Sequence, residues 1–418
     1  MTASTINGAR QPRTAAFGFV FASALMNSVS FGIMIPILPN LIKQMNGGDT
    51  AAASVWTAVF ATFWGLMQFF CGPILGMLSD RFGRRPVLLV SIFGLFVDFL
   101  FMAFAPTLQW LFVGRVFNGI TASSFSTANA YVADITPPEK RAHNFGIMGS
   151  AFGVGFVLGP TIGGVLGEHN LRWPFLAAAA LCAINWIYGL LVLPESLPLE
   201  RRSKIQWSRA NPIGSLLFLH STPNLLGLAS VGLLFQLGFT VLPTIFVLYT
   251  GYRYGWTPQI LGFTFMATGV SQIVVQAFLV GPAVRRLGER GAVLVGLVAG
   301  SLAFAIYGLA PTGWLYLCGV PVFALTGFIQ PGLMGLMSQR VGPTHQGQLQ
   351  GANQSLQGIA SFSAPSFFGF VFAWAVRHDA TLHLPGLPIL ASAALFGVAF
   401  FLSLRVATPL SVSQRPPA

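Results

Sequence analysis

Charged residues are scarce in this sequence. Asp, Glu, Lys and Arg make up 8% of its 418 residues, whereas about a quarter of an ordinary soluble domain is charged. Hydrophobic residues account for 54%. A surface with so few charges must mostly face lipid, so the composition excludes a water-soluble protein and predicts an all-α membrane protein.

Cysteine and histidine are also rare, and their positions exclude several kinds of site. The cysteines, Cys71, Cys182 and Cys318, all fall in apolar stretches, which favours free buried thiols over a disulfide framework or a metal site. The six histidines lie in or near loops without the spacing of metal ligands. A Walker phosphate loop is absent, which argues against transport driven by ATP. We therefore expect neither an enzyme nor a cofactor.

The net charge of +12 would by itself suggest a nucleic-acid partner. However, most Lys and Arg fall in loops on one side of the predicted membrane spans, and only Lys43, Arg172, Arg253 and Arg377 fall on the other. By the positive-inside rule the basic side is cytoplasmic, which places both termini in the cytoplasm. No separate basic domain is left to bind nucleic acid. Residues 1–15 precede no cleavage site, so the first span is expected to be retained.

Twelve apolar segments are long enough to cross a bilayer, which takes about 20 residues. The longest hydrophilic stretch between them, 194–222, predicts a cytoplasmic linker between two six-helix halves, 1–193 and 223–418. We expect a monomer embedded in the lipid bilayer. The predicted spans are 16–38, 53–77, 87–105, 110–133, 144–167, 174–193, 223–248, 258–281, 291–310, 314–336, 348–373 and 386–406.

The two halves repeat at an offset of 205 positions. Ala105-Pro106-Thr107 recurs as Ala310-Pro311-Thr312, Gly83 recurs as Gly288, and Pro160 as Pro365. Two parallel repeats around a site at the membrane midplane are typical of major-facilitator transporters.

The segment GMLSDRFGRRP, 76–86, joins spans 2 and 3 and resembles the signature loop of the major facilitator superfamily. Asp80 at a helix end can pair with an arginine, and such a charge latch would hold one conformation and release in another. A basic loop that only sets topology is the alternative. In the second half the loop reads RRLGERG, with Arg285 in place of Asp80. The predicted gating residues are Asp80, Arg81, Arg84, Arg85, Asp134 and Arg141.

Span 5 contains glycines one turn apart beside a proline, in GIMGSAFGVGFVLGPTIGG. Small residues let helices approach closely, and the proline removes a backbone hydrogen bond. The segment resembles the motif of drug-proton antiporters, although ordinary close packing would need similar residues. The matching positions are Gly146, Gly155, Gly159, Pro160, Gly163 and Gly164.

Further segments are similar to the tetracycline-efflux branch of proton-coupled antiporters. They include PILPNL in 36–41, AYVADITPPEKRAHNFG in 130–146, YRYGW in 252–256 and QGQLQG in 346–351. The resemblance covers nearly the whole chain. It implies export of a drug-like small molecule against inward proton flow, in the inner membrane of a bacterium.

Asp98, in span 3, is the one acid deep in a predicted span, and Arg115, in span 4, is the one deep base. Charges at this depth are costly and therefore mark candidate functional sites. Burial favours the protonated form of Asp98 and a nearby cation favours the carboxylate, as a switchable proton carrier requires. The alternative is a structural ion pair with Arg115. The corresponding positions of the second half are Ala303 and Val320.

The chain departs from the tetracycline exporters at three positions. Asn27 and Gly300 replace acids in spans 1 and 9, and Gln272 replaces a histidine in span 8. These changes argue against tetracycline itself and against a proton route through the second half. Amides can bind neutral or zwitterionic groups, or they can join helices. The predicted substrate-binding residues are Asn27, Asn118, Gln236, Gln272 and Gln330.

Three functions remain open at this point. The first is a proton-coupled exporter of amphipathic compounds that depends on Asp98. The second, motivated by Asn27, Gln272 and Gly300, is an uncoupled facilitator or importer of a metabolite. The third is a membrane receptor that does not transport, against which the intact gating loop argues.

Overall fold

The computed structural model describes residues 13–122, 124–137, 140–203, 219, 225–341 and 346–407. These residues form helices and no strand. Those of the first half are α1 (Arg13–Met34), α2 (Leu38–Met45), α3 (Thr50–Phe82), α4 (Arg84–Phe104), α5 (Leu108–Thr121), α6 (Ser124–Ile135), α7 (Arg141–His169) and α8 (Trp173–Val192). A short 3-10 turn, η2 (Leu199–Arg201), follows.

The second half has the same order of spans, with more irregular backbone. Its helices are α10 (Leu225–Phe239), α11 (Val241–Tyr254), α12 (Pro258–Val274), the π-helix η5 (Val275–Leu279), α13 (Val280–Leu309), α14 (Gly313–Ala324), the 3-10 helix η6 (Leu325–Phe328), α15 (Ile329–Ser338), α16 (Gln346–Arg377), α17 (Asp379–Leu382) and α18 (Leu387–Val406).

The predicted twelve-span, all-α membrane architecture is confirmed. Ten helical stretches of the described chain are long and apolar enough to cross a membrane. One of them, Pro258–Leu309, has 52 residues and contains two crossings, because a bilayer core of about 30 Å needs only about 20 helical residues. The two crossings meet at Gly288, where the backbone is not helical. The remaining crossing consists of α5 and α6, which flank residue 123, outside the described residues.

The repeat found in the sequence recurs in the backbone. Gly83 and Gly288 both have positive φ, 108° and 69°, at the turn after the second span of each half. Thr107 and Thr312 have nearly the same extended conformation at the start of α5 and α14. The first span of each half is also broken at matching places, after Met34 and after Phe239, which hydropathy did not predict.

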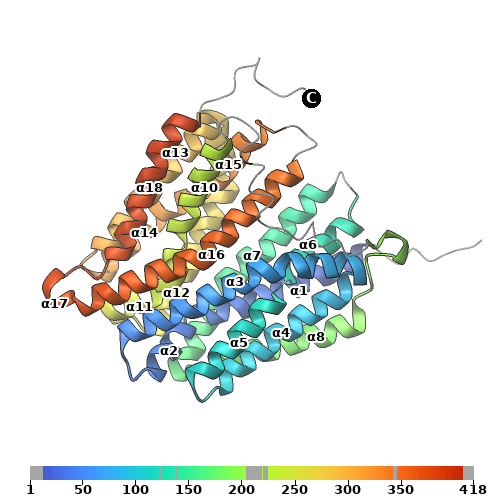
Figure 1. Ribbon diagram of the computed structural model, residues 1–418, viewed down its shortest axis with the longest axis horizontal. Coiled ribbons are helices and arrows are strands. Elements are labelled where there is room, and N and C mark those ends of the chain that lie inside the picture. Colours follow the sequence, from blue (N-terminus) through green and yellow to red (C-terminus); the bar gives the residue numbers. More distant parts are fainter. Residues whose placement is uncertain are drawn as a thin grey trace, which may run out of the picture.

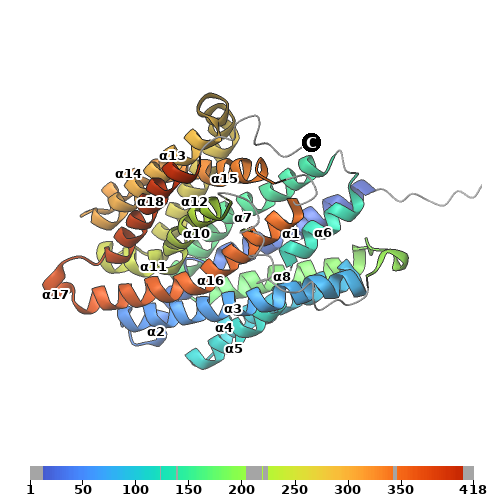
Figure 2. The same cartoon turned by 45° about the horizontal axis from the view of Figure 1, so that its top comes forward.

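Among the described residues, the contacts between the halves lie at one end of the membrane and extend to about mid-span. We call the end with Gly83 and Gly288 the basic end, and the end with Asp49, Asn170 and Gly255 the opposite end. From the opposite end toward mid-span, α3 packs on α16 and α7 packs on α12. Figures 1 and 2 show the helices of the two halves close together near α2, α11 and α17 and diverging toward α6 and α15.

Side-chain hydrogen bonds support the contact between α3 and α16. Ser54 Oγ donates to the carbonyl oxygen of Gly369 at 2.8 Å, and the hydroxyls of Thr62 and Ser366 lie 2.7 Å apart. The largest apolar core cluster extends across both halves, whereas a second, around Phe19 and Tyr131, stays within the first. These contacts hold the two halves together from the opposite end.

The linker predicted at 194–222 is described as far as residue 203 and at residue 219. Residues 195–203 lie against the basic end of the first half, where Ser203 N donates to the carbonyl oxygen of Asp80 at 3.1 Å. The rest of the linker, and the termini 1–12 and 408–418, lie outside the described residues. The boundaries of the two halves stay a prediction.

Candidate functional site

The deepest charges of the first half form an ion pair. Asp98 on α4 and Arg115 on α5 are joined by a bond of 2.8 Å between Oδ2 and Nη1. The exposed fraction of Asp98 is 0% and that of Arg115 is 5%. The other carboxylate oxygen, Oδ1, has no hydrogen-bond partner among the described residues and faces Gly114. A buried carboxylate with one free oxygen is a group that a proton can neutralise.

Arg115 is held from three sides. Besides Asp98, its Nη1 lies 3.2 Å from Met34 Sδ, at the break that ends α1. Its guanidinium carbon lies 5.6 Å from the ring centroid of Trp64 on α3, within the range of a cation–π contact. Trp64 Nε1 donates to Asn118 Oδ1 at 2.7 Å. The predicted residue Asn118 thus belongs to the surroundings of the ion pair.

Trp64 was not predicted from the sequence. Most of its neighbours along α3 are apolar, so hydropathy assigns it to the lipid or to the core without distinguishing it from the other aromatics. The repeat offers the one available signal, because position 269 of the second half, which corresponds to Trp64, is glycine.

Asn27 lies in the interior of the first half. Its Oδ1 accepts a hydrogen bond of 3.1 Å from Asn185 Nδ2 on α8, and the same amide lies 3.2 Å from the carbonyl oxygen of Ser23. This contact joins α1 to α8, as expected for an amide that links helices. Asn27 is 9% exposed, and its predicted role in substrate binding stays a prediction.

The glutamines predicted for the second half lie apart from the ion pair. Gln272 on α12 donates to Thr326 Oγ1 on η6 over a long 3.4 Å, and its Oε1 faces Gly327. Gln236 is partly buried and Gln330 is exposed. No hydrogen bond joins the three glutamines to one another within the described part of the chain.

Packing accounts for the missing acid at position 300. A Cβ on Gly300 would lie 2.3 Å from the ring of Phe396, so α13 and α18 leave no room for a side chain there. Position 300 is therefore a close contact between helices in this chain.

Three of the residues predicted to gate form a cluster of ion pairs around Arg84, the first residue of α4. Arg84 binds Asp80 and, at 3.0 Å from Nε to Oδ2, Asp134. Ser196 Oγ also donates to Asp134 Oδ2 at 3.1 Å. All these residues belong to the first half or its following segment, so no ion pair seen in the described residues joins the halves at the basic end.

The other predicted gating residues make different contacts. Arg85 Nη2 donates to the carbonyl oxygen of Leu190 at 2.7 Å, and Arg290 makes the same kind of bond to Leu404 in the second half. Arg81 is exposed, with no ion pair to another described residue. Arg141 begins α7, and its side chain lies outside the described residues.

Glu195 is a member of this cluster that sequence reasoning missed. Its Oε1 and Oε2 accept hydrogen bonds from the backbone N–H groups of Arg84 and Arg85, at 2.9 and 3.2 Å. A carboxylate is favourable at the N-terminus of a helix, where backbone donors lack partners. Arg202 Nη2 approaches the same carboxylate at 4.0 Å. The distance of 111 positions between Glu195 and Arg84 hid this contact in the sequence.

Replacing Gly83 with alanine should destabilise the protein. The backbone at Gly83, with φ 108° and ψ 162°, is accessible almost only to glycine, at a cost of about 1–3 kcal/mol for other residues. The added Cβ would also collide with the Glu195 carboxylate. Thermal unfolding in detergent should show a lower midpoint for Gly83→Ala and no loss for Gly76→Ala, whose Cβ meets nothing within 4 Å. Equal midpoints for the two variants would contradict the prediction.

The glycines of α7 serve two different contacts. A Cβ on Gly155, Gly159 or Gly163 would come within 2.7 Å of α1, so these residues let the two helices of the first half pack closely. Gly164 instead faces α12, where a Cβ would lie 2.4 Å from the carbonyl oxygen of Pro258. The carbonyl oxygen of Pro160 also faces α12, where Gly262 approaches it, while the ring of Pro160 lies against Gly32 of α1. Gly146 meets nothing within 4 Å and makes no such contact.

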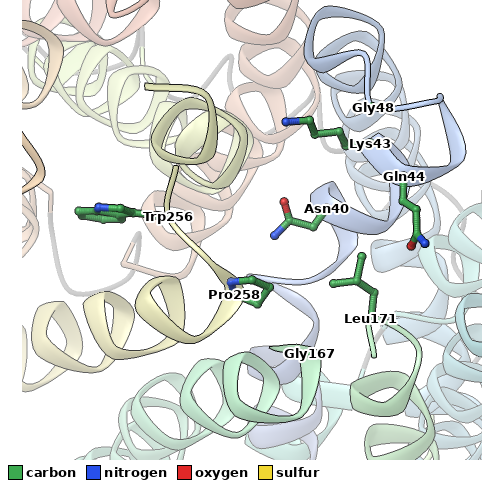
Figure 3. Close-up of a pocket in the computed structure, with 8 residues that line it drawn as sticks. All are labelled: Asn40, Lys43, Gln44, Gly48, Gly167, Leu171, Trp256 and Pro258. Atoms are coloured by element: carbon green, nitrogen blue, oxygen red, sulfur yellow. The ribbon is translucent and has the colours of Figure 1, made fainter. Parts of the chain in front are cut away.

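A pocket of about 400 Å³ lies at the opposite end, between the two halves. Asn40, Lys43 and Gln44 of α2 and Leu171 line it from the first half, and Trp256 from the second. Figure 3 shows Asn40 and Leu171 pointing toward the middle of this group and Gln44 pointing away. The pocket contains none of the predicted site residues. The described chain has no group of three His, Cys, Asp or Glu residues that could hold a metal ion.

Two six-helix repeats in a membrane, with a buried ion pair in one of them, define a secondary transporter by architecture. A family model for the Major Facilitator Superfamily matches residues 20–365. The chain belongs to this superfamily, whose members are transporters that bind small molecules and are not enzymes.

Curated relatives refine this assignment. The chain is similar to the class C tetracycline resistance protein of Escherichia coli, with 36% identity over 354 residues, covering 85% of this chain and 89% of that protein. The class H protein of Pasteurella multocida is 31% identical over 395 residues, covering 94% and 97%. Multidrug resistance protein 2 of Bacillus subtilis (strain 168) is 25% identical, covering 88% and 90%. The predicted resemblance to the tetracycline-efflux branch is confirmed.

Solved structures share the fold at low sequence identity. The human organic anion transporter MFSD10 (TETRAN) matches with a TM-score of 0.68 and 22% identity, covering 94% of this chain and 100% of that chain. The nucleoside transporter NupG matches with a TM-score of 0.75 and 14% identity, covering 94% and 98%. These likenesses concern the fold alone.

Proposed function

We propose that this transporter exports small amphipathic, drug-like molecules in exchange for protons, with Asp98 as the proton carrier. The single observation that carries the proposal is the buried pair of Asp98 and Arg115, whose carboxylate keeps one oxygen without a partner. The similarity to tetracycline and multidrug resistance proteins supports export as the direction.

The proposed mechanism is alternating access between the two ends. The halves touch at the opposite end, so in this state substrate enters between them from the basic end. When Asp98 is ionised, the pair with Arg115 is neutral overall. When Asp98 takes up a proton, Arg115 keeps an uncompensated charge and the pair weakens, which favours a different arrangement of α4 and α5. Inward proton flow would thus drive a conformational change in the first half.

The second half would supply uncharged contacts to the substrate. Gln236, Gln272 and Gln330 can donate and accept hydrogen bonds without the desolvation cost of a charge. Gln272 lies beside two irregular helices, η5 and η6, and such backbone inside a membrane is often found at functional sites. Together with Asn27 and Asn118, these residues form the proposed substrate-binding set.

We further propose the inner membrane of a bacterium as the location, with the basic end and both termini in the cytoplasm and the protein acting as a monomer. The basic loops with Arg84, Arg85, Arg285 and Arg286 support this orientation through the positive-inside rule. A reporter enzyme that is active only outside the cytoplasm, fused after residue 418, should stay inactive. Activity of that fusion would contradict the orientation.

The second candidate is an uncoupled facilitator, and the state of Asp98 favours it. A carboxylate already paired at 2.8 Å with a buried arginine can be purely structural. Asn27, Gln272 and Gly300 also lack the charges of the tetracycline exporters. In that case substrate would equilibrate across the membrane whether or not a pH gradient is present.

Substituting Asp98 should separate these two functions. A pH gradient is imposed across inverted membrane vesicles that contain the protein. Accumulation of tetracycline, ethidium and a panel of other antibiotics and dyes inside the vesicles is then measured. For an exported compound, Asp98→Asn should abolish gradient-driven accumulation, because the asparagine amide cannot take up and release a proton as a carboxylate does. Exchange of labelled for unlabelled compound, which moves no net proton, should persist.

Glu200→Gln is the control, because Glu200 is an exposed acid outside the spans and should leave both measurements unchanged. If accumulation in the wild type ignores the gradient, or if Asp98→Asn accumulates as the wild type does, proton antiport through Asp98 is wrong. Accumulation of no compound of the panel, together with tight binding of one of them, would favour the receptor.

A further inference from the structure

Trp64 joins the buried ion pair to the less buried side of the first half. Its indole N–H is bonded to Asn118 and its ring lies against Arg115. Phe31 of α1 lies on it, with 6.1 Å between ring centroids. Asp98, Arg115 and Asn118 are all at most 5% exposed, whereas Trp64 is only partly buried. The ring therefore forms the outer layer over this polar cluster.

The position of Trp64 is fixed by its helix. A Cβ on Gly119 of α5 would lie 3.1 Å from the carbonyl oxygen of Trp64 and 2.8 Å from Met67 Cβ, so α5 packs directly on α3 at this point. The backbone of Trp64 cannot move without moving α5, but the side chain is held by one hydrogen bond and by ring contacts. The ring is the part of the cluster that can be displaced.

The second half shows that this arrangement is not needed for the fold. At the offset of 205 positions, the cluster of Trp64, Asp98, Arg115 and Asn118 corresponds to Gly269, Ala303, Val320 and Phe323. The ring, the acid, the base and the amide are thus present together in one half and absent together from the other. Helices at equivalent places pack without any of them.

We propose that Trp64 is the positioning residue that keeps Arg115 on Asp98, and that displacement of its ring opens the pair to proton transfer. The consequence for transport rests on the proposed role of Asp98. With the ring in place, Arg115 has a cation–π contact on one side and the carboxylate on the other, and water is kept from both. Without it, Arg115 is free to turn away and Asp98 is left to accept a proton.

Reaction of Asp98 with dicyclohexylcarbodiimide tests this directly, because the reagent attacks protonated carboxyl groups in apolar surroundings. The carboxyl oxygen bonds to the carbodiimide carbon and the acid proton goes to a carbodiimide nitrogen. The rate is measured in membranes at fixed pH by mass spectrometry of the peptide that contains Asp98. Asp98→Asn defines the background.

Trp64→Leu should react roughly tenfold faster than the wild type, the size expected when a cation–π contact and a hydrogen bond are both lost. Trp64→Phe keeps a ring over Arg115 and should restore most of the protection. Trp56→Leu, on the same helix but paired with Phe60, is the matched control and should stay within about twofold of the wild type.

An unchanged rate in Trp64→Leu would overturn the proposal, and so would an equal increase in Trp56→Leu, which would indicate general loosening of α3. If Trp64→Leu fails to fold, Trp64→Phe carries the test. Loss of the N–H bond to Asn118 should make it react somewhat faster than the wild type, and a rate equal to that of the wild type would overturn the proposal. The labelling needs no transport. If the wild type shows no gradient-driven accumulation while Trp64→Leu labels faster, proton antiport fails and the positioning role of Trp64 stands.

Discussion

Arg115→Leu should be among the most destabilising substitutions in this protein, and Asp98→Asn should rescue it. Removing the arginine leaves the carboxylate of Asp98 buried at 0% exposure without its partner. Breaking a buried ion pair in this way typically costs about 3–5 kcal/mol. The second substitution removes the stranded charge, so the double variant should recover most of the loss. The measurement is a double-mutant cycle: the thermal unfolding of the wild type, the two single variants and the double variant is compared in detergent.

The cycle distinguishes a coupled pair from two independent residues. Simple addition of the two single effects would contradict the pairing, because residues that share one interaction must show a coupling term. Arg81→Leu is the control for loss of an arginine, since Arg81 is exposed and should change the unfolding midpoint little. The double variant is also expected to fold but to show no transport driven by a pH gradient, so stability and coupling can be measured apart.

The membrane architecture could be predicted because its cause is local. A run of about 20 apolar residues is enough to specify a crossing, and the glycines at 83 and 288 mark matching turns in the two halves. The break after Met34 also has a local cause, since Pro36 and Pro39 follow it, and it could have been predicted. The break between Phe239 and Val241 also has a local cause, since Gly238 precedes it and Pro243 cannot donate the helical hydrogen bond to the carbonyl oxygen of Phe239.

The site could be predicted only in part, because its contacts are distant in the chain. Asp98 and Arg115 stood out as rare charges, and their pairing was one of two alternatives that the residues left open. Glu195 and Trp64 had no such mark. A glutamate after a span and a tryptophan within one are ordinary residues, and their roles arise from packing against Arg84 and Arg115.

The glycine motif of α7 predicts close packing but does not identify the helices that pack against it. The sequence predicted close packing for all of its glycines but not the partner of each helix face. In the structure one face packs within the first half and another packs on α12 of the second half, so the same motif serves the fold and the contact between halves. Gly164 lies on the face that packs on α12, so substituting it is the most direct test of alternating access.

Gly164→Val should block transport while leaving the first half folded. Its side chain cannot fit against Pro258 and Gly262 of α12, where the backbones touch at the opposite end. Overpacking a close contact costs about 1–3 kcal/mol, so the state closed at the opposite end should become roughly ten to a hundred times less populated. Transport in vesicles should fall to a similar extent. Gly146→Val is the control, because a Cβ there would meet nothing within 4 Å.

The same substitution should expose residues that the contact now buries. Ser54 is 0% exposed and its hydroxyl is bonded to Gly369 across the halves. In a background without the three native cysteines, Ser54→Cys should react slowly with an impermeant maleimide applied from the opposite end, and markedly faster when Gly164→Val is added. If transport is lost but the reactivity stays slow, the valine has damaged α7 itself. If transport and cysteine reactivity both stay as in the wild type, closure at the opposite end does not depend on the contact between α7 and α12. A protein that closes through this contact would be affected by a valine side chain placed in it.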